Sequence, residues 1–428
     1  MADYYFRDRC RMCDGTSLAK VMTLESTPPG NNFLQVDEIS HTETVYPLEL
    51  YLCSQCTHVQ LGHVVDPSIL YRKSYNYVSG TSPAFVRHLR DYASDMIRRF
   101  SLVPDDLVVD IGSNDGTCLQ GFRTAGMNVL GIDPAPQIAE RATAAGVPTV
   151  CEFFSIDLAE RLRAKHGPAS FITSHNTCAH IDRLDDVFRA VNHWLDYDGV
   201  FVLEVGYFLD VYQNSWFDTI YHEHLDYHTV RPFEALLSRI GMELFRVERV
   251  SPQGGSIRLF TQRANGPHKA DDSISSLVAL ERHHQLDRPE TFIRFRQRID
   301  EVGVQLKSIV SGLIKQGKSI AAFGAPTKST TLLTHFKLAR NEVDFIVDDN
   351  PLKHGLFSPL LHIPVLNPAE LYRRRSDYLL ILAWNFAEQI MTAHAAYLER
   401  GGGFILPMPV PRIVDRHNAS KSQARDGA

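Results

Sequence analysis

Short apolar runs alternate with longer amphipathic stretches through the middle of the chain. Apolar runs of this length indicate buried strands, and the stretches between them have the spacing of helices. The expected strands are 128–133, 147–153, 169–176 and 200–205, preceded by one that starts at Leu107. The expected helices are 83–100, 157–166, one ending at Leu195, and 232–240. This alternation predicts a parallel sheet covered by helices.

Two more apolar runs close this region and are expected to pair with each other. Residues 243–250 and 256–263 flank Gln253-Gly-Gly, which is typical of a tight connection between antiparallel strands. We therefore expect an antiparallel hairpin at one edge of the sheet.

The last third of the chain predicts a second α/β unit. Residues 289–315 form a long helix whose apolar positions recur every three or four residues, as on a core-facing stripe. A strand, a loop and a helix follow from Lys318, and further strands are expected at 343–347 and 378–383. The polar and basic residues 414–428 are expected to be a disordered tail.

Composition narrows the class of protein. The chain has 428 residues, enough for about three domains, and its hydrophobic (44%) and charged (22%) fractions are ordinary for a globular protein. A net charge of -6 argues against a nucleic-acid partner. We find neither a signal peptide nor an apolar run of about 20 residues, so we expect a cytoplasmic enzyme with no membrane partner.

Four cysteines near the N-terminus form two Cys-x-x-Cys knuckles. Cys10 and Cys13 make the first, and Cys53 and Cys56 the second. Four thiolates at this spacing suit one tetrahedral Zn²⁺, and an all-protein ligand set leaves no open position for chemistry, so the zinc should be structural. The long gap predicts an inserted hairpin around 21–50. Two unrelated pairs of buried cysteines are the alternative, and His58 is a less favoured substitute ligand.

A glycine-containing loop follows the strand that starts at Leu107. The sequence Asp110-Ile-Gly112-Ser-Asn114-Asp-Gly116 resembles motif I of S-adenosylmethionine (AdoMet) methyltransferases, with Asn114 in place of the usual middle glycine. Glycines let a ligand approach the backbone, and a carboxylate such as Asp133 at the end of the next strand takes ribose hydroxyls. NAD fits the same logic but prefers Gly-x-Gly-x-x-Gly. The expected cofactor-binding residues are Asp110, Gly112, Asn114, Gly116, Asp133, Phe153 and Asn176.

The richest chemistry lies just after strand 200–205. Residues 218–228 hold three histidines, two tyrosines and three carboxylates, a composition without a clean apolar face and typical of a loop that moves protons. Ligands of parallel sheets bind at the carboxyl ends of the strands. Asp133, His180 and this loop should therefore open onto the same edge of the sheet.

Two other segments are candidates for substrate contacts. Gly324-Ala-Pro-Thr-Lys328 joins a strand to a helix and suits an anionic group at a helix N-terminus, with Lys328 as the first candidate, although no Walker motif is present. A plain α/β cap is the alternative. Tyr75 and Tyr77 belong to an aromatic connector that either packs as a linker or reaches over the active site.

The order of these motifs resembles that of AdoMet-dependent sugar C-methyltransferases. The resemblance covers Cys10 to about Arg412 and rests most on Tyr221-His-Glu-His224 and Gly324-Ala-Pro-Thr-Lys328, with Ala179-His180-Ile in support. The family includes the C-3' methyltransferases of tetronitrose-type and tylosin-type deoxysugar pathways, which act on nucleotide-linked 4-keto sugars.

The resemblance implies roles for particular residues. The general base would be His224, and Tyr221, Glu223, His180 and Tyr75 would surround the sugar. It also implies AdoMet as the cofactor, a structural zinc, and a nucleotide diphosphate held largely by the C-terminal domain, with dTDP the favoured nucleotide. The expected substrate-binding residues are Tyr77, His222, Gly324, Lys328 and Asn385.

The expected organisation is an α/β protein with a zinc-binding module at 1–70, a Rossmann-like class I methyltransferase domain at 71–264, and a second Rossmann-like domain at 265–413. We expect a monomer or small homo-oligomer. The favoured reaction is C-methylation at C-3', through an enolate made by proton removal next to the ketone. Methylation at C-5', methylation of oxygen or nitrogen in a small metabolite, and a non-enzymatic zinc-ribbon protein are the alternatives.

Overall fold

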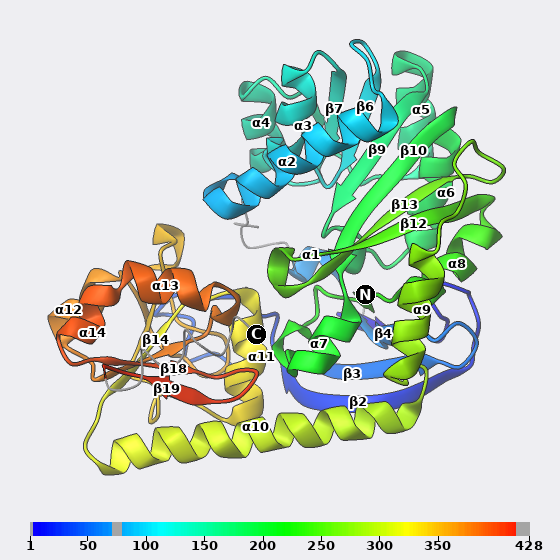
Figure 1. Cartoon of the computed structure of the whole chain (residues 1–428). Helices are drawn as coiled ribbons and strands as arrows, with labels where there is room; N and C mark the ends of the chain where they lie inside the picture. The colour runs from blue at the N-terminus through cyan, green and yellow to red at the C-terminus, as the bar shows by residue number, and fades with distance from the viewer. Residues whose placement is uncertain (1–2, 71–78, 417–428) are drawn as a thin grey trace.

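The computed structural model describes residues 3–70 and 79–416. The chain folds around three sheets: a four-stranded sheet near the N-terminus, a seven-stranded central sheet and a six-stranded C-terminal sheet (Figure 1). Among the described residues, no helix combines the length and apolar character needed to cross a membrane. The predicted α/β architecture is confirmed.

The N-terminal sheet has the strand order β11-β4-β3-β2. Strands β2 (Leu18–Thr27) and β3 (Tyr46–Cys53) are the antiparallel hairpin expected between the cysteine knuckles, and β4 (Val59–Leu61) pairs with β3. The fourth strand, β11 (Asp226–Tyr227), comes from the histidine-rich loop. Part of the candidate catalytic segment is therefore built into the zinc module's sheet.

A small separate pair of strands joins β1 (Tyr4–Phe6) to β5 (His63–Val65), and the short α1 (Pro67–Leu70) follows.

The central sheet has the order β12-β13-β10-β9-β6-β7-β8, parallel except where β13 pairs with β10 and β12. The predicted hairpin thus forms the antiparallel edge. The strands are β6 (Leu107–Ile111), β7 (Asn128–Ile132), β8 (Thr149–Val150), β9 (Ala169–His175), β10 (Leu195–Gly206), β12 (Met242–Val250) and β13 (Ser256–Arg263). The helices beside them are α2 (Pro83–Phe100), α3 (Thr117–Thr124), α4 (Pro136–Ala144), α5 (Ile156–His166), α6 (Leu184–Trp194) and α8 (Val230–Arg239).

Strand β8 is much shorter than the predicted run 147–153. It lies at the sheet edge, and Pro148 has no N–H to offer a ladder. Phe153, expected to end the strand, is 69% exposed instead. Helices α7 (Phe208–Asn214) and α9 (Ser273–His283) were not expected from the apolar pattern.

The C-terminal sheet has the order β16-β15-β14-β17-β18-β19, parallel except for β19. Its strands are β14 (Ile320–Phe323), β15 (Ile346–Val347), β16 (Val365–Leu366), β17 (Tyr378–Ile381), β18 (Gly403–Leu406) and β19 (Arg412–Val414). Its helices are α11 (Thr327–Phe336), α12 (Ala369–Arg374), α13 (Ala387–Ala393) and α14 (Ala395–Glu399). The strand predicted at 343–347 is confined to β15. Val414, expected to begin the tail, instead ends β19 and is buried, and the predicted tail beyond position 416 lies outside the described residues.

Helix α10 (Pro289–Lys315) runs beneath the N-terminal sheet and on to the C-terminal sheet (Figure 1). Its bounds match the prediction, and its apolar stripe is buried as expected. Phe292 stacks on Phe208 of α7, with ring centroids 5.8 Å apart, and Arg296 donates to the carbonyl of Thr23 in β2. The helix therefore ties all three parts of the molecule together.

Candidate active site

The loop between β6 and α3 turns sharply on three residues with positive φ. These are Gly112 (75°), Asn114 (50°) and Gly116 (78°). A Cβ on Gly112 would lie 2.1 Å from Oγ1 of Thr177, so no side chain fits there. The turn carries the backbone close to the carboxyl ends of β6 and β9, the place where a cofactor binds in such sheets.

Two carboxylates support this loop differently. Asp133 accepts from the backbone N–H of Asn114 at 3.0 Å and from that of Ala135 at 2.9 Å, so it holds the loop in place. Asp110 is buried, and its Oδ1 has no hydrogen-bond partner among the described residues. Burial, followed by the charge of Asp133, raises the pKa of Asp110 well above its usual range. The glycine turn and the unpartnered carboxyl of Asp110 fit AdoMet, because AdoMet has hydrogen-bond donors that can pair with a carboxylate.

The segment that follows the connector closes over the same loop. The Ser79 N–H donates to Oδ1 of Asn114 at 2.8 Å, a contact that the usual glycine of motif I would lack. Asn176 has a φ of 56°, and its N–H donates to the carbonyl of Glu204 at 2.8 Å. Tyr75 and Tyr77 lie outside the described residues, so their expected contacts remain predictions.

The histidine-rich loop brings its acid/base groups onto His224. The Nε2 atom of His224 lies 2.6 Å from Oη of Tyr221, and its Nδ1 lies 3.0 Å from the carbonyl of Thr219. The ring of His180 meets that of His224 edge-on, with centroids 4.9 Å apart. The N–H of Leu225 donates to the carbonyl of Ala179 at 2.7 Å, so the two sequence-distant segments are also joined through their backbones.

This geometry fixes which nitrogen of His224 is basic. The carbonyl of Thr219 can only accept, so Nδ1 carries the hydrogen and the lone pair is on Nε2, facing Tyr221. Burial, followed by the charge of His180, lowers the pKa of His224 well below 6.5. Burial likewise lowers the pKa of His180 to about 4. Both imidazoles are therefore neutral near pH 7, as a general base must be before it accepts a proton.

Glu223 faces the C-terminal part of the chain. The residue is 8% exposed, and burial raises the pKa of its carboxyl to about 7, against the opposing charge of Lys353. Lys353 itself donates to the carbonyl of Ala325 at 2.7 Å, and burial lowers its pKa. Sequence reasoning missed Lys353. The only local signal was its place just beyond β15, near the carboxyl edge of the second sheet.

Three of the expected substrate contacts lie close together at the domain interface. Lys328 donates to Oδ1 of Asn385 at 2.8 Å, and its Nζ lies 3.5 Å from the ring centroid of Trp384. Gly324 has a φ of 90° and begins the loop that leads to Lys328. Trp384 in turn donates to Asp218 at 2.7 Å, which connects this group to the histidine-rich loop.

Burial shapes the charges in this interface. It lowers the pKa of Lys328 and raises that of Asp218, while the attraction between the two groups opposes both shifts. The rings of Trp216 and Trp384 stack beside this group, with centroids 4.7 Å apart.

His222 is placed differently from its neighbours. It is 1% exposed, and its Nε2 lies 3.1 Å from the carbonyl of Tyr46 in the N-terminal sheet. Its other ring nitrogen, Nδ1, has no hydrogen-bond partner among the described residues, and its contact with substrate stays a prediction. The chain turns at His222 and Glu223, where the N–H of His224 donates to the carbonyl of Tyr221 at 2.9 Å.

The four cysteines form one compact cluster. Cys10 and Cys56 have Sγ atoms 3.5 Å apart, as do Cys13 and Cys53, and all four sulfurs lie within 4.8 Å of one another. Tetrahedral zinc with bonds of about 2.3 Å holds its sulfurs at roughly this spacing, so the cluster fits one Zn²⁺. His58 is not part of it; it is fully buried and lies 2.6 Å from Asp226.

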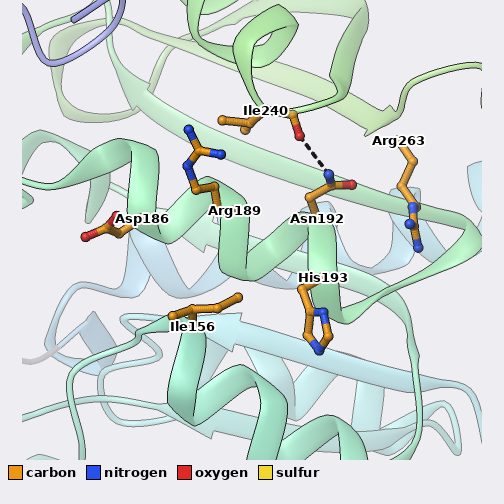
Figure 2. Close-up of a pocket in the computed structure, with 7 residues that line it drawn as sticks. All are labelled: Ile156, Asp186, Arg189, Asn192, His193, Ile240 and Arg263. Atoms are coloured by element: carbon orange, nitrogen blue, oxygen red, sulfur yellow. Dashed lines mark hydrogen bonds between the residues drawn. The ribbon is translucent and has the colours of Figure 1, made fainter.

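A separate hollow of about 400 Å³ lies away from these groups. Figure 2 shows its lining side chains, which include Asn192, His193 and Arg263. Asn192 and His193 come just before β10 starts, and Arg263 is the last residue of β13. They lie at the end of these strands that is opposite to the histidine-rich loop. The hollow is therefore no part of the candidate active site.

The fold, the candidate active site and the four-cysteine cluster define an AdoMet-dependent methyltransferase with an N-terminal zinc-binding module. Comparison with family models agrees. Residues 10–71 match a domain described as zinc binding, residues 85–247 a methyltransferase domain, and residues 251–409 a C-methyltransferase C-terminal domain.

The C-methyltransferase NovU of Streptomyces niveus is 34% identical over 407 residues, which make up 95% of this chain and 97% of that protein. The chain belongs to the C-methyltransferase family. Its predicted cofactor class is confirmed, and methyl transfer to carbon is its activity.

Solved structures align more weakly. An AdoMet-dependent methyltransferase from Clostridium acetobutylicum is 14% identical and covers 42% of this chain and 92% of its own, with a TM-score of 0.35. The magnesium protoporphyrin IX methyltransferase ChlM of Synechocystis, with bound S-adenosylhomocysteine, is 15% identical and covers 42% of this chain and 83% of its own, with a TM-score of 0.34. Likeness at this level carries no information on the substrate.

Proposed function

We propose that this enzyme methylates a carbon next to the ketone of a nucleotide-linked 4-keto deoxysugar, with C-3' favoured and dTDP the favoured nucleotide. The observation that carries the proposal is the basic Nε2 of a neutral, half-buried His224, held beside Tyr221 and His180. Methyl transfer to carbon needs a carbon nucleophile, and a proton next to a ketone is the one that such a base removes.

The proposed roles of His224, Tyr221 and His180 follow from the acid/base and hydrogen-bonding atoms that each presents. Nε2 of His224 takes the proton once substrate displaces the hydroxyl of Tyr221, and that hydroxyl, or His180, then hydrogen-bonds the oxygen that gains charge. AdoMet, when bound, supplies an electrophilic methyl group on a sulfonium. The Gly112 turn with Asn114 and Gly116, the carboxyls of Asp110 and Asp133, and Asn176 are the residues proposed to hold it, with Phe153 at the rim.

Positive charge beside the site supports an anionic substrate. Lys328 and Lys353 are both half-buried, both come from the C-terminal unit, and each has an electrostatic partner on the histidine-rich loop. A diphosphate there would be stabilised by their charges and by the nearby Asn385 and Gly324. Glu223 is proposed to bind a hydroxyl or amine of the sugar. Methylation at C-5' is the second candidate, because the ketone activates both neighbouring carbons.

The test is mass spectrometry of a panel of nucleotide 4-keto-6-deoxysugars incubated with the purified enzyme in D₂O, with and without AdoMet. We expect deuterium to enter next to the ketone without cofactor, and one methyl group to appear on carbon with it. Methylation without any exchange would contradict the enolate route. Neither exchange nor methylation of any sugar in the panel would contradict the substrate class.

A further inference from the structure

Arg11 is a charged side chain in an unusual place. It lies inside the first zinc knuckle, between Cys10 and Met12, yet it is 1% exposed and among the largest fully buried side chains. A buried guanidinium is costly unless its N–H groups are paired. The partners of the Arg11 N–H groups therefore show which segments this side chain holds together.

The guanidinium reaches both candidate catalytic segments. Its Nε donates to Oδ1 of Asp182 at 3.0 Å, and Asp182 lies two residues after His180. Its Nη1 donates to the carbonyl of Leu225 at 3.3 Å, directly after His224, and to that of Leu61 at 2.9 Å. One side chain from the zinc knuckle thus bridges the segments that carry the two edge-on imidazoles, His180 and His224.

Neighbouring contacts hold the same two segments from the same module. Asp182 also accepts from Tyr5 at 2.5 Å and Arg7 at 3.0 Å. Asp226, next to Leu225, lies 3.9 Å from Nε of Arg11 and 2.6 Å from His58. The module therefore clamps one segment through Asp182 and the other through Asp226, and Arg11 contributes to both.

The backbone of the knuckle fixes where Arg11 starts. The N–H of Arg11 donates to Oε1 of Gln60 at 2.9 Å, and Gln60 pairs with Asp226 across β4 and β11. The thiolates of Cys10 and Cys13, on either side of Arg11, belong to the cluster that fits zinc. Any loosening of that knuckle would move the base of the Arg11 side chain.

We propose that Arg11 is a positioning residue, which holds His180 and His224 in register and through which zinc occupancy sets the geometry of the active site. The proposal rests on the proposed roles of these two histidines. It gives the zinc module, which has no open coordination position, a direct part in turnover without a part in the chemistry.

The test compares Arg11→Met with Arg9→Met, a matched change of an exposed arginine from the same segment whose partner is Asp14. Arg11→Met should keep its zinc and its AdoMet affinity but lose about 100-fold in kcat, because small misplacements of catalytic groups cost this much. Substrate deuterium exchange without AdoMet should fall in parallel. Arg9→Met should behave like the wild type. Normal kcat and exchange in a zinc-loaded Arg11→Met enzyme would overturn the proposal.

A second measurement needs no substrate. Amide hydrogen exchange, followed by mass spectrometry, should speed up in peptides covering 179–182 and 224–227, both in Arg11→Met and in the wild type stripped of zinc by a chelator. If Arg11→Met does not fold, Arg11→Lys, which keeps the charge but not the fork of donors, takes its place. Unchanged exchange in both peptides would overturn the proposal. If the wild-type enzyme is inactive on every sugar, faster exchange in Arg11→Met would still support the positioning role of Arg11. Only the proposed substrate would then be rejected.

Discussion

At the scale of residues, the candidate active site depends on the tautomer of one imidazole. The Thr219 carbonyl holds the hydrogen of His224 on Nδ1, which leaves Nε2 as the base, and burial keeps that base neutral. Since the pKa of His224 lies well below 6.5, the base stays competent below neutral pH. Any acid limb of kcat/KM due to His224 should therefore lie below pH 6.5.

Replacing His224 with Asn should lower both methyl transfer and substrate deuterium exchange by at least about 100-fold, the usual contribution of a general base. AdoMet affinity, measured by calorimetry, should not change. His222→Gln is the neighbouring control: its amide can still donate to the Tyr46 carbonyl, so exchange should persist. Near-normal exchange in His224→Asn with both ligands bound would place the base elsewhere.

Glu223 should carry a cost in stability. Its pKa is about 7 when folded and 4.5 when unfolded, so between these values the folded state holds a proton that the unfolded state has lost. Stability therefore falls as pH rises through this window, by up to about 3 kcal/mol above pH 7. Glu223→Gln should unfold at higher temperature than wild type at pH 8, but not at pH 4, and should turn over more slowly. Equal melting temperatures at pH 8 would contradict this.

The residue scale also shows how far sequence reasoning reaches. The meeting of His180, Tyr221 and His224 follows from the rule that strand ends share one edge of a sheet. Arg11 and Lys353 could not be found that way, because their contacts with Asp182 and Glu223 join segments that are far apart in the sequence. The contact of His222 with the carbonyl of Tyr46 could not be found that way either, because it joins the loop to a distant sheet, and its role toward substrate stays a prediction.

At the scale of elements, long periodic segments were predictable and short ones were not. Helix α10 matches its predicted bounds because its stripe repeats over many turns. Strands β11 and β15, of two residues each, exist only because a partner strand is presented to them. Helices α7 and α9 were missed, since neither has a distinct apolar pattern.

The contact between η3 (Phe217–Thr219) and α11 should behave as one energetic unit. Lys328→Met would leave Asp218 buried without a nearby cation, and Asp218→Asn would remove the carboxylate that the cation balances. We expect the double variant to be more stable than the sum of the single losses predicts, by about 1 kcal/mol or more. Denaturant unfolding of the four proteins measures this coupling. Strict additivity would show that the two groups do not interact.

At the scale of the whole molecule, the zinc module is a part of the enzyme's core and not an appendage. Its sheet takes a strand from the histidine-rich loop, and its face packs on α10. The architecture of three linked units was predictable from the order of motifs. The shared sheet was not, because nothing in the sequence near Asp226 indicates a partner at Gln60.

Cys53→Ser should reduce the yield of folded protein and lower the melting temperature, because the free energy of metal binding contributes to folding. Zinc content by atomic absorption and thermal unfolding would measure both effects. Any folded fraction should also turn over slowly if the knuckle holds Arg11 in place. A folded, zinc-free and fully active variant would contradict the structural role of the metal.

The stack of Trp216 on Trp384 has one more consequence. The chain contains three tryptophans, and two of them face each other across the boundary between the methyltransferase and C-terminal units. The electronic transitions of indoles this close couple, so the protein should show an exciton couplet in its far-ultraviolet circular dichroism. Trp216→Phe should abolish it, whereas Trp194→Phe should not. This signal would report whether the methyltransferase and C-terminal units stay packed together while substrate binds, without any added label.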